Sequence, residues 1–187
     1  AIVYRTDKVK VNNYSVYTGT ESFAYTPLIA NFETIESGSN FDFSLITIHT
    51  SPSLAETEIP ALKTVMDEVK TLYTEPDVIC LGDYNADGSY YTEGSDDWLS
   101  GFDITAYITG ILNSVDTTVA LSSNTYDRIQ MTKSLSTDYT GDADVFKFGD
   151  VYDLTSCEGT TTTAGTEDAI SDHYPVWCEY YTDQDTE

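Results

Sequence analysis

Basic residues are scarce in this sequence. Eight Lys and Arg stand against 32 Asp and Glu, so the formal net charge at pH 7 is −24. The eight are scattered between Arg5 and Lys147 and form no cluster. At long range such a chain repels nucleic acid, so any phosphate ligand must be held by metal ions or by a few local donors. The same excess of acid is typical of a solvated surface in an extracellular or saline setting.

Cysteine is also rare, and its spacing excludes several kinds of site. The three cysteines include no Cys-x-x-Cys pair and no zinc-binding spacing. Cys80 lies in an apolar run and is expected to be a buried thiol. Cys157 and Cys178 are candidates for a disulfide, although the sequence does not prove that they pair.

Long apolar runs are missing as well. None approaches the ~20 residues of a membrane span, and no signal peptide is visible. The chain opens on Ala1 within a strand-like segment, which predicts a processed or truncated product. The sequon Asn13-Tyr14-Ser15 and the abundance of Thr, Ser and Tyr favour export, so an extracellular or cell-surface location is expected.

What is present is a composition that folds: 40% of residues are hydrophobic and 13% aromatic. We expect one domain over residues 1–187, with an acidic tail, 183–187, that frays. Apolar residues at three- and four-residue spacing predict a helix over 59–72 and a second over 104–112. Residues 12–22 and most of 132–168 are expected to be loops. Strands are predicted at 2–11, 23–32, 41–49, 78–81, 126–131 and 176–181. This alternation indicates a layered α/β domain.

Polar side chains suited to metal or phosphate chemistry follow these strands. His49 ends one strand, Asp83 and Asn85 follow the buried strand, and Asp127 begins another. Asp172 and His173 come just before the last strand. Side chains at the ends of adjacent strands converge in space. Each feature alone is ordinary turn or surface chemistry, but the chain has only two His and both fall in such clusters.

The same segments resemble the endonuclease/exonuclease/phosphatase superfamily, and deoxyribonuclease I in particular. The likeness spans residues 1 to about 181. The matching blocks begin with Tyr4-Arg5 and Asp7-Lys8-Val9, Ile48-His49 with Ser51-Pro52, and Leu81-Gly82-Asp83-Tyr84-Asn85-Ala86-Asp87. They continue with Asp116-Thr117-Thr118, Tyr126-Asp127-Arg128-Ile129, and Ala169-Ile170-Ser171-Asp172-His173-Tyr174-Pro175-Val176.

The resemblance implies a role for each of these residues. It makes His173 the general base, Asp127 its orienting partner, and His49 the acid that assists the leaving oxygen. It makes Asp83 and Asp172 positioners or ligands of Mg²⁺ or Mn²⁺, with Asn85 binding a phosphate oxygen or assisting at the metal. Asp116 and Thr118 resemble a structural Ca²⁺ loop. The implied fold is an α/β (α+β) two-sheet sandwich flanked by helices, and the implied substrate is DNA or another phosphodiester.

Several features of the family pattern are missing from this chain. The first strands of the family fold, which carry an Asn and a metal-binding Glu, would precede Ala1. A glutamate that orients His49 would also precede it. A phosphate-binding Arg is replaced around Tyr25-Thr26-Pro27, and a cysteine is replaced by Gly88. We therefore expect the fold to lack its N-terminal portion and to be completed by a preceding segment or a second chain.

Three functions remain open from the sequence. The favoured one is a metal-dependent DNA endonuclease that is complete only with the missing segment. The extreme negative charge and the lost Arg favour, instead, an impaired domain that serves as a structural or adhesive module of an extracellular surface or filament. The lack of a basic patch also fits a phosphoesterase that acts on small or lipid phosphoesters.

Overall fold

A computed structural model of the chain describes residues 1–95, 97–154 and 167–186. Its main element is a six-stranded mixed sheet with strand order β1-β2-β3-β4-β6-β5. A second sheet holds two antiparallel strands, β7 and β8. The strands are β1 (Val9–Val16), β2 (Leu28–Thr34), β3 (Asp42–His49), β4 (Val78–Asp83), β5 (Tyr107–Thr109), β6 (Asp127–Thr132), β7 (Tyr139–Val145) and β8 (Val176–Tyr180).

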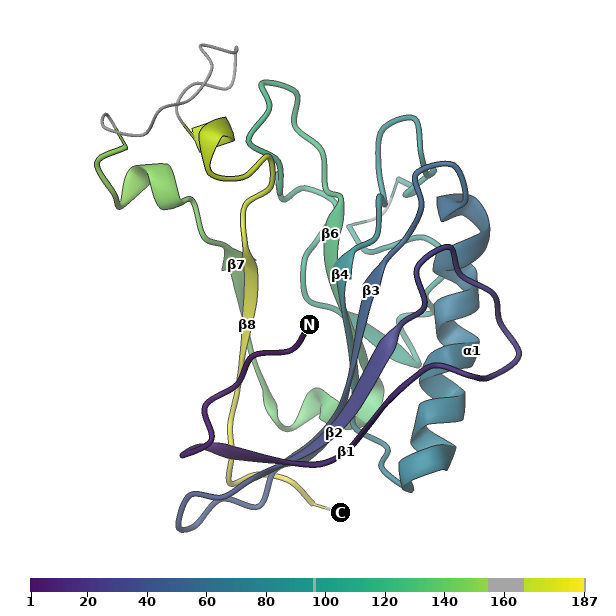
Figure 1. The fold of residues 1–187 in the computed structure, drawn as a ribbon, viewed down its shortest axis with the longest axis vertical. Coiled ribbons are helices and arrows are strands. Elements are labelled where there is room, and N and C mark those ends of the chain that lie inside the picture. The colour runs from purple at the N-terminus through teal and green to yellow at the C-terminus, as the bar shows by residue number, and fades with distance from the viewer. Residues whose placement is uncertain (96, 155–166, 187) are drawn as a thin grey trace.

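The long helix α1 (Ala55–Tyr73) covers one face of the six-stranded sheet, and β7 and β8 lie over the other (Figure 1). The apolar stripe of the helix, from Ile59 to Val69, packs on Ile46, Val78 and Cys80 of the sheet. On the opposite face, Ile129 and Met131 pack against residues of the second sheet, including Val176 and Cys178. The sandwich expected from the resemblance is therefore present, with one α-helix among the described residues.

These strands and the helix were predictable because their apolar residues recur with a clear strand or helix period. The predictions for 41–49, 78–81, 126–131 and 176–181 are confirmed within two residues at either end. The helix predicted over 59–72 is also confirmed. It begins four residues earlier, and Pro60 lies inside its second turn. It ends at Tyr73, where Thr74 takes a left-handed conformation with φ 58° before Pro76.

Three other predictions differ from the structure in their bounds or in the type of structure. The first strand covers Val9–Val16 instead of 2–11, because an edge strand tolerates the polar residues that suggested a loop at 12–22. The second is shifted from 23–32 to Leu28–Thr34. Residues 132–168 also contain β7, whose Gly141 and two Asp are typical of a turn, and whose pairing with β8 is irregular.

The second predicted helix, over 104–112, is also wrong. Residues Tyr107–Thr109 form the short strand β5, which pairs with β6. The β-branched residues in this segment favour a strand over a helix, and the backbone of Gly110 donates to Ile129 of β6. In the tail expected to fray, the Asp185 carbonyl accepts from Asn40, between β2 and β3, at 2.6 Å, and its side chain accepts from the N–H of Asp42 at the start of β3, at 3.4 Å.

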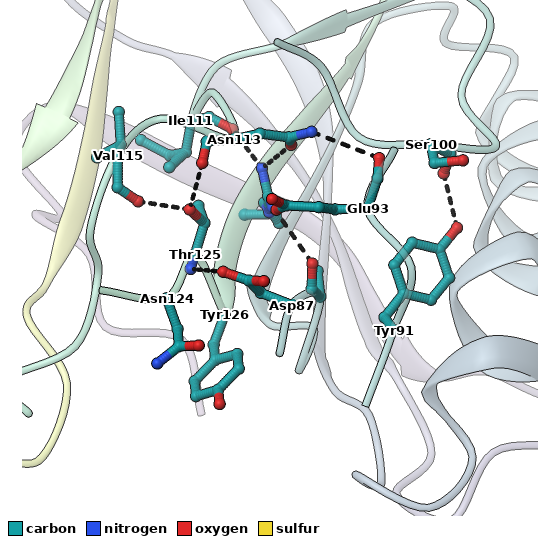
Figure 2. A network of polar contacts seen from close by, with 12 residues as sticks. Asp87, Tyr91, Glu93, Ser100, Ile111, Asn113, Val115, Asn124, Thr125 and Tyr126 are labelled. Carbon is teal, nitrogen blue, oxygen red and sulfur yellow. Dashed lines mark hydrogen bonds and ion pairs between the residues drawn. The ribbon is translucent and has the colours of Figure 1, made fainter. Parts of the chain in front are cut away.

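Arg128 fixes the loops at one end of β6. Its side chain is fully buried, and it donates to the Ile111 carbonyl at 3.1 Å and to Asn113 Oδ1 at 2.7 Å. It also donates to the Ala86 carbonyl and to Glu93 Oε2, at 3.3 and 2.9 Å. Figure 2 shows the groups around it, with Asn113 and Glu93 joined by a further hydrogen bond.

The Arg128 network stabilises the fold through its hydrogen bonds rather than through net attraction between charged groups. Burial lowers the pKa of Arg128 and raises the pKa of Glu93, so desolvation opposes the charged form of both partners. The bonds join the loop after β4, the segment after β5 and the first residues of β6, next to Asp127. Arg128 therefore ties both of these loops to the start of β6.

We expect Arg128→Met to lower the free energy of unfolding by about 2–4 kcal/mol, because it leaves Glu93 and several buried oxygens without a donor. Urea unfolding followed by circular dichroism measures this. The control is Lys133→Met, which removes an exposed cation just beyond the same strand and should change stability by less than about 0.5 kcal/mol. Equal effects of the two substitutions would contradict the role of the network.

Candidate active site

Three of the predicted site residues lie in one row across the main sheet. In the parallel pairing of β3 with β4, His49 is opposite Asp83. In the antiparallel pairing of β4 with β6, Asp83 is opposite Asp127. His49 Nε2 is 3.8 Å from Asp83 Oδ2. The strand register alone therefore brings an imidazole and two carboxylates together.

Gly82 allows this close approach of β3 and β4. Its φ is +143°, and a Cβ at this position would collide with the carbonyl oxygen of Ile48, one residue before His49. A side chain here would separate the strands next to Asp83.

His173 joins the row from the segment just before β8. Its Nδ1 lies 2.7 Å from Asp127 Oδ2. Asp83, Asp127 and His173 each offer an atom suited to a metal, and these atoms all lie within 4.8 Å of one another. The carboxylates of Asp83 and Asp127 suit a hard divalent cation, since such ions prefer oxygen ligands. The described side chains therefore fit a divalent metal.

Thr117 holds the two halves of this group in place. Its buried hydroxyl oxygen accepts from the backbone N–H of Tyr126 and Asp127, at 3.0 and 3.1 Å. Its carbonyl accepts from the N–H of Tyr174, at 2.9 Å. One residue thus fixes the backbone on both sides of the Asp127–His173 hydrogen bond. Sequence reasoning placed Thr117 only within a Ca²⁺ loop, because its contacts are long-range.

Asn85 lies beside Asp83, and its side-chain amide already makes one hydrogen bond within the protein. Its φ is 49°, in the left-handed region that Asn tolerates. The backbone N–H of Asn85 donates to Asp83 Oδ1 at 2.8 Å, and its side-chain Nδ2 donates to the Thr50 carbonyl at 2.9 Å. The amide is therefore oriented by the turn after His49 and fixes Asp83 in return.

Asp172 is placed differently from the other acids. Its side chain is exposed, and it is outside the group of three residues that share the 4.8 Å limit. Its negative charge still acts on His173, and its carbonyl accepts from the N–H of Val119. Asp172 is thus near the site without contributing to its compact part.

Asp116 and Thr118, the residues of the expected Ca²⁺ loop, bond to one another. Asp116 Oδ1 accepts from the N–H and the hydroxyl of Thr118, both at 3.0 Å, and from the N–H of Asn124 at 3.2 Å. Thr118 Oγ1 also donates to the Ser122 carbonyl. These bonds close the loop as a polar turn. The loop also forms a bridge between Thr118 and His173.

Two aromatic side chains that sequence reasoning did not assign flank the imidazoles. The ring of Tyr25 lies 5.2 Å from that of His49, and the ring of Tyr126 lies 5.9 Å from that of His173. The only signal for Tyr25 was its place where the family pattern has an Arg. The proposed disulfide is not tested, because Cys157 lies outside the described residues. Cys178 Sγ lies 3.3 Å from the Tyr180 hydroxyl.

The electrostatics of the site are governed by its acids. The hydrogen bond to Asp127 raises the pKa of His173 to about 9. Burial, followed by the charge of Asp127, raises the pKa of Asp83. The charged groups that act on these two residues are carboxylates and imidazoles.

Known proteins of similar sequence are deoxyribonucleases. Over 181 residues the chain is 32% identical to deoxyribonuclease-1-like 1 of Sus scrofa, covering 96% of this chain and 55% of that protein. Over 184 residues it is 33% identical to deoxyribonuclease-1 of Oryctolagus cuniculus, covering 93% and 62%.

The chain belongs to the endonuclease/exonuclease/phosphatase superfamily. It spans somewhat more than half the length of these relatives. No model of a protein family matched it.

Solved structures of this superfamily share the fold. A TDP2 of D. rerio complexed with single strand DNA product has a TM-score of 0.61 at 17% identity, covering 95% of this chain and 70% of that one. A mannosyl-6-phosphatase of Bacteroides thetaiotaomicron has a TM-score of 0.59 at 16% identity, covering 95% and 69%. Within the described part of the chain, no helix has the length and apolar character to cross a bilayer.

The Asp127–His173 pair should make folding stability depend on pH. The pKa of His173 is raised in the fold from its ordinary 6.5 to about 9. The pair therefore stabilises the fold fully below pH 6.5, and this contribution is lost as the pH rises to about 9. The wild type should have a higher free energy of unfolding than His173→Gln at pH 6.5, and this difference should disappear as the pH rises to about 9. Urea unfolding at a series of pH values measures the difference, and a constant difference would contradict the pairing.

Proposed function

We propose that this chain is the larger part of a metal-dependent phosphodiesterase that cleaves DNA as an endonuclease. The observation that carries the proposal is the convergence of Asp83, Asp127 and His173 within 4.8 Å, with His49 3.8 Å from Asp83. Its deoxyribonuclease relatives support hydrolysis of a phosphodiester. The assigned roles follow the same geometry.

His173 is the general base in this proposal. Asp127 accepts a hydrogen bond from Nδ1–H, which leaves Nε2 as the nitrogen that takes a proton from the attacking water. The same carboxylate stabilises the imidazolium that forms. Because the pKa of His173 is about 9, the neutral base becomes more abundant as the solution turns alkaline.

His49 is the acid on the leaving-group side. Its side chain is 58% exposed, and its Nε2 lies 3.8 Å from Asp83 Oδ2. The imidazole is therefore open to a ligand and can donate a proton to the leaving oxygen. Asp83 and the nearby Asp172, with Asn85 assisting, would hold Mg²⁺ or Mn²⁺. When bound, the metal neutralises phosphate charge and stabilises the transition state. Asn85 positions a phosphate oxygen.

A further polypeptide segment is part of the proposal. His49 has its ring contact with Tyr25 and its carboxylate neighbour Asp83, but the resemblance expects a further glutamate to orient it. We propose that a preceding segment or a second chain supplies this group and completes the sandwich. We also propose an extracellular location, because the excess of acidic residues is typical of that setting. Asp116 and Thr118 remain the proposed Ca²⁺ loop.

We expect plasmid DNA to be nicked in the presence of Mg²⁺ and left intact in EDTA. His173→Ala should lower the rate about 10²- to 10⁴-fold, since general base catalysis is lost. The control Leu72→Ala, on the exposed side of α1, should leave the rate unchanged. The protein is assayed as the full natural polypeptide.

The same assay separates the other functions. Turnover of inositol phosphates or sphingomyelin without nicking would favour a phosphoesterase of small or lipid substrates. No turnover of any substrate, with or without metal, would contradict an enzymatic function and leave a structural or adhesive module.

A further inference from the structure

Tyr25 presents an open aromatic surface beside the proposed acid. Tyr25 is 59% exposed, and its ring lies 5.2 Å from the His49 ring at 61° between the planes. The imidazole contacts the Tyr25 ring on one side, while more than half of the residue remains exposed to solvent. An exposed aromatic ring next to a reacting group is suited to contact with a ligand.

A buried carboxylate holds Tyr25 in this position. Glu58 of α1 is 2% exposed and accepts from two backbone N–H groups. One belongs to Ala24, at 2.6 Å, and the other to Ser51, at 2.8 Å. The segment that carries Tyr25 is therefore tied to the turn that follows His49. This preorganises the ring relative to the imidazole, so a ligand binds without the entropy cost of ordering the loop.

The basic residues of the chain are poorly placed to hold phosphates. All eight lie within the described residues, and five are paired with carboxylates: Arg5 with Asp7, Lys8 with Glu36, Lys10 with Glu33, Lys70 with Asp67, and Arg128 with Glu93. Of the other three, Lys63 donates to a carbonyl, Lys147 lies over the Tyr174 ring at 5.8 Å, and Lys133 is exposed just beyond the end of β6. Duplex DNA is bound largely through neutralised phosphates. The basic side chains among the described residues therefore contribute little to holding a phosphodiester beside this site, which leaves a role for another kind of contact.

Aromatic rings also lie on the His173 side of the site. The Tyr126 ring is 5.9 Å from the His173 ring, and the Tyr90 ring is 5.6 Å from that of Tyr126. The two imidazoles thus each have a Tyr beside them, with Asp83 between. Stacking of bases on such rings is tolerant of sequence and does not depend on positive charge.

We propose that Tyr25 stacks against an unpaired base next to the scissile phosphate, so that single-stranded DNA is preferred over duplex DNA. This inference rests on the proposed hydrolysis of phosphodiesters and specifies its substrate. In a duplex the faces of the bases are covered by their neighbours, whereas an unpaired base can place its face on the Tyr25 ring. The phenyl ring supplies the contact, and the hydroxyl is not required.

The test measures binding separately from cleavage. A short fluorescent single strand, and a hairpin that contains the same sequence as duplex, are titrated by fluorescence anisotropy in Mg²⁺ against full-length protein carrying His173→Ala. In that background Tyr25→Ala should weaken binding of the single strand about 5- to 150-fold. Tyr25→Phe should bind within about twofold of the parent. Tyr14→Ala, which removes a 75% exposed tyrosine of β1, is the matched control and should have no effect.

The results that would overturn the proposal are distinct from failure of the enzymatic function. Equal weakening by Tyr25→Ala and Tyr14→Ala, tighter binding of the hairpin than of the single strand, or no binding of the single strand would each overturn it. Cleavage by protein with an intact His173 is measured in parallel. Suppose that Tyr25→Ala loses affinity for the single strand but the protein with an intact His173 cleaves no DNA. This result would support the stacking contact and reject the hydrolase.

Discussion

The site depends on the register of three adjacent strands. Pairing of β3 with β4 and of β4 with β6 places His49, Asp83 and Asp127 in one row, and Gly82 permits the backbone approach that this requires. Because side chains alternate between the faces of a strand, a slip of one residue would send Asp83 to the opposite face. The buried apolar residues on both faces of these strands fix the register, so the packing of the core determines the geometry of the polar row.

The second half of the site is joined to this row by hydrogen bonds from outside the sheet. Thr117 binds the backbone at Asp127 and at Tyr174, and Arg128 ties the surrounding loops to β6. His173 therefore meets Asp127 although it precedes a strand of the other sheet. Acidic groups dominate the site and the whole surface, which makes a cation and uncharged aromatic contacts the natural means of holding a phosphodiester.

The sequence predicted the parts of the fold that a hydrophobic pattern determines. The strands around Val78 and Ile129 and the helix around Leu62 are buried, so their periodicity is clear. The bounds of the edge strand β1 were misplaced, and the Gly- and Asp-containing β7 and the short β5 were missed, because the structure of these residues depends on pairing with distant segments. In the site, the two His and their acidic neighbours were found from the strand ends. Thr117 and Tyr25 were not assigned roles, since their contacts exist only in three dimensions.

The convergence of both imidazoles on one divalent cation is tested most directly by proton NMR with Mn²⁺. The signals of the two imidazoles, His49 and His173, are assigned by comparison with the variants His49→Gln and His173→Gln. Substoichiometric Mn²⁺ should broaden the signals of His49 and His173 together, and Asp83→Asn should remove the effect at the same concentration. Broadening of one imidazole alone, or of neither, would contradict a shared metal site.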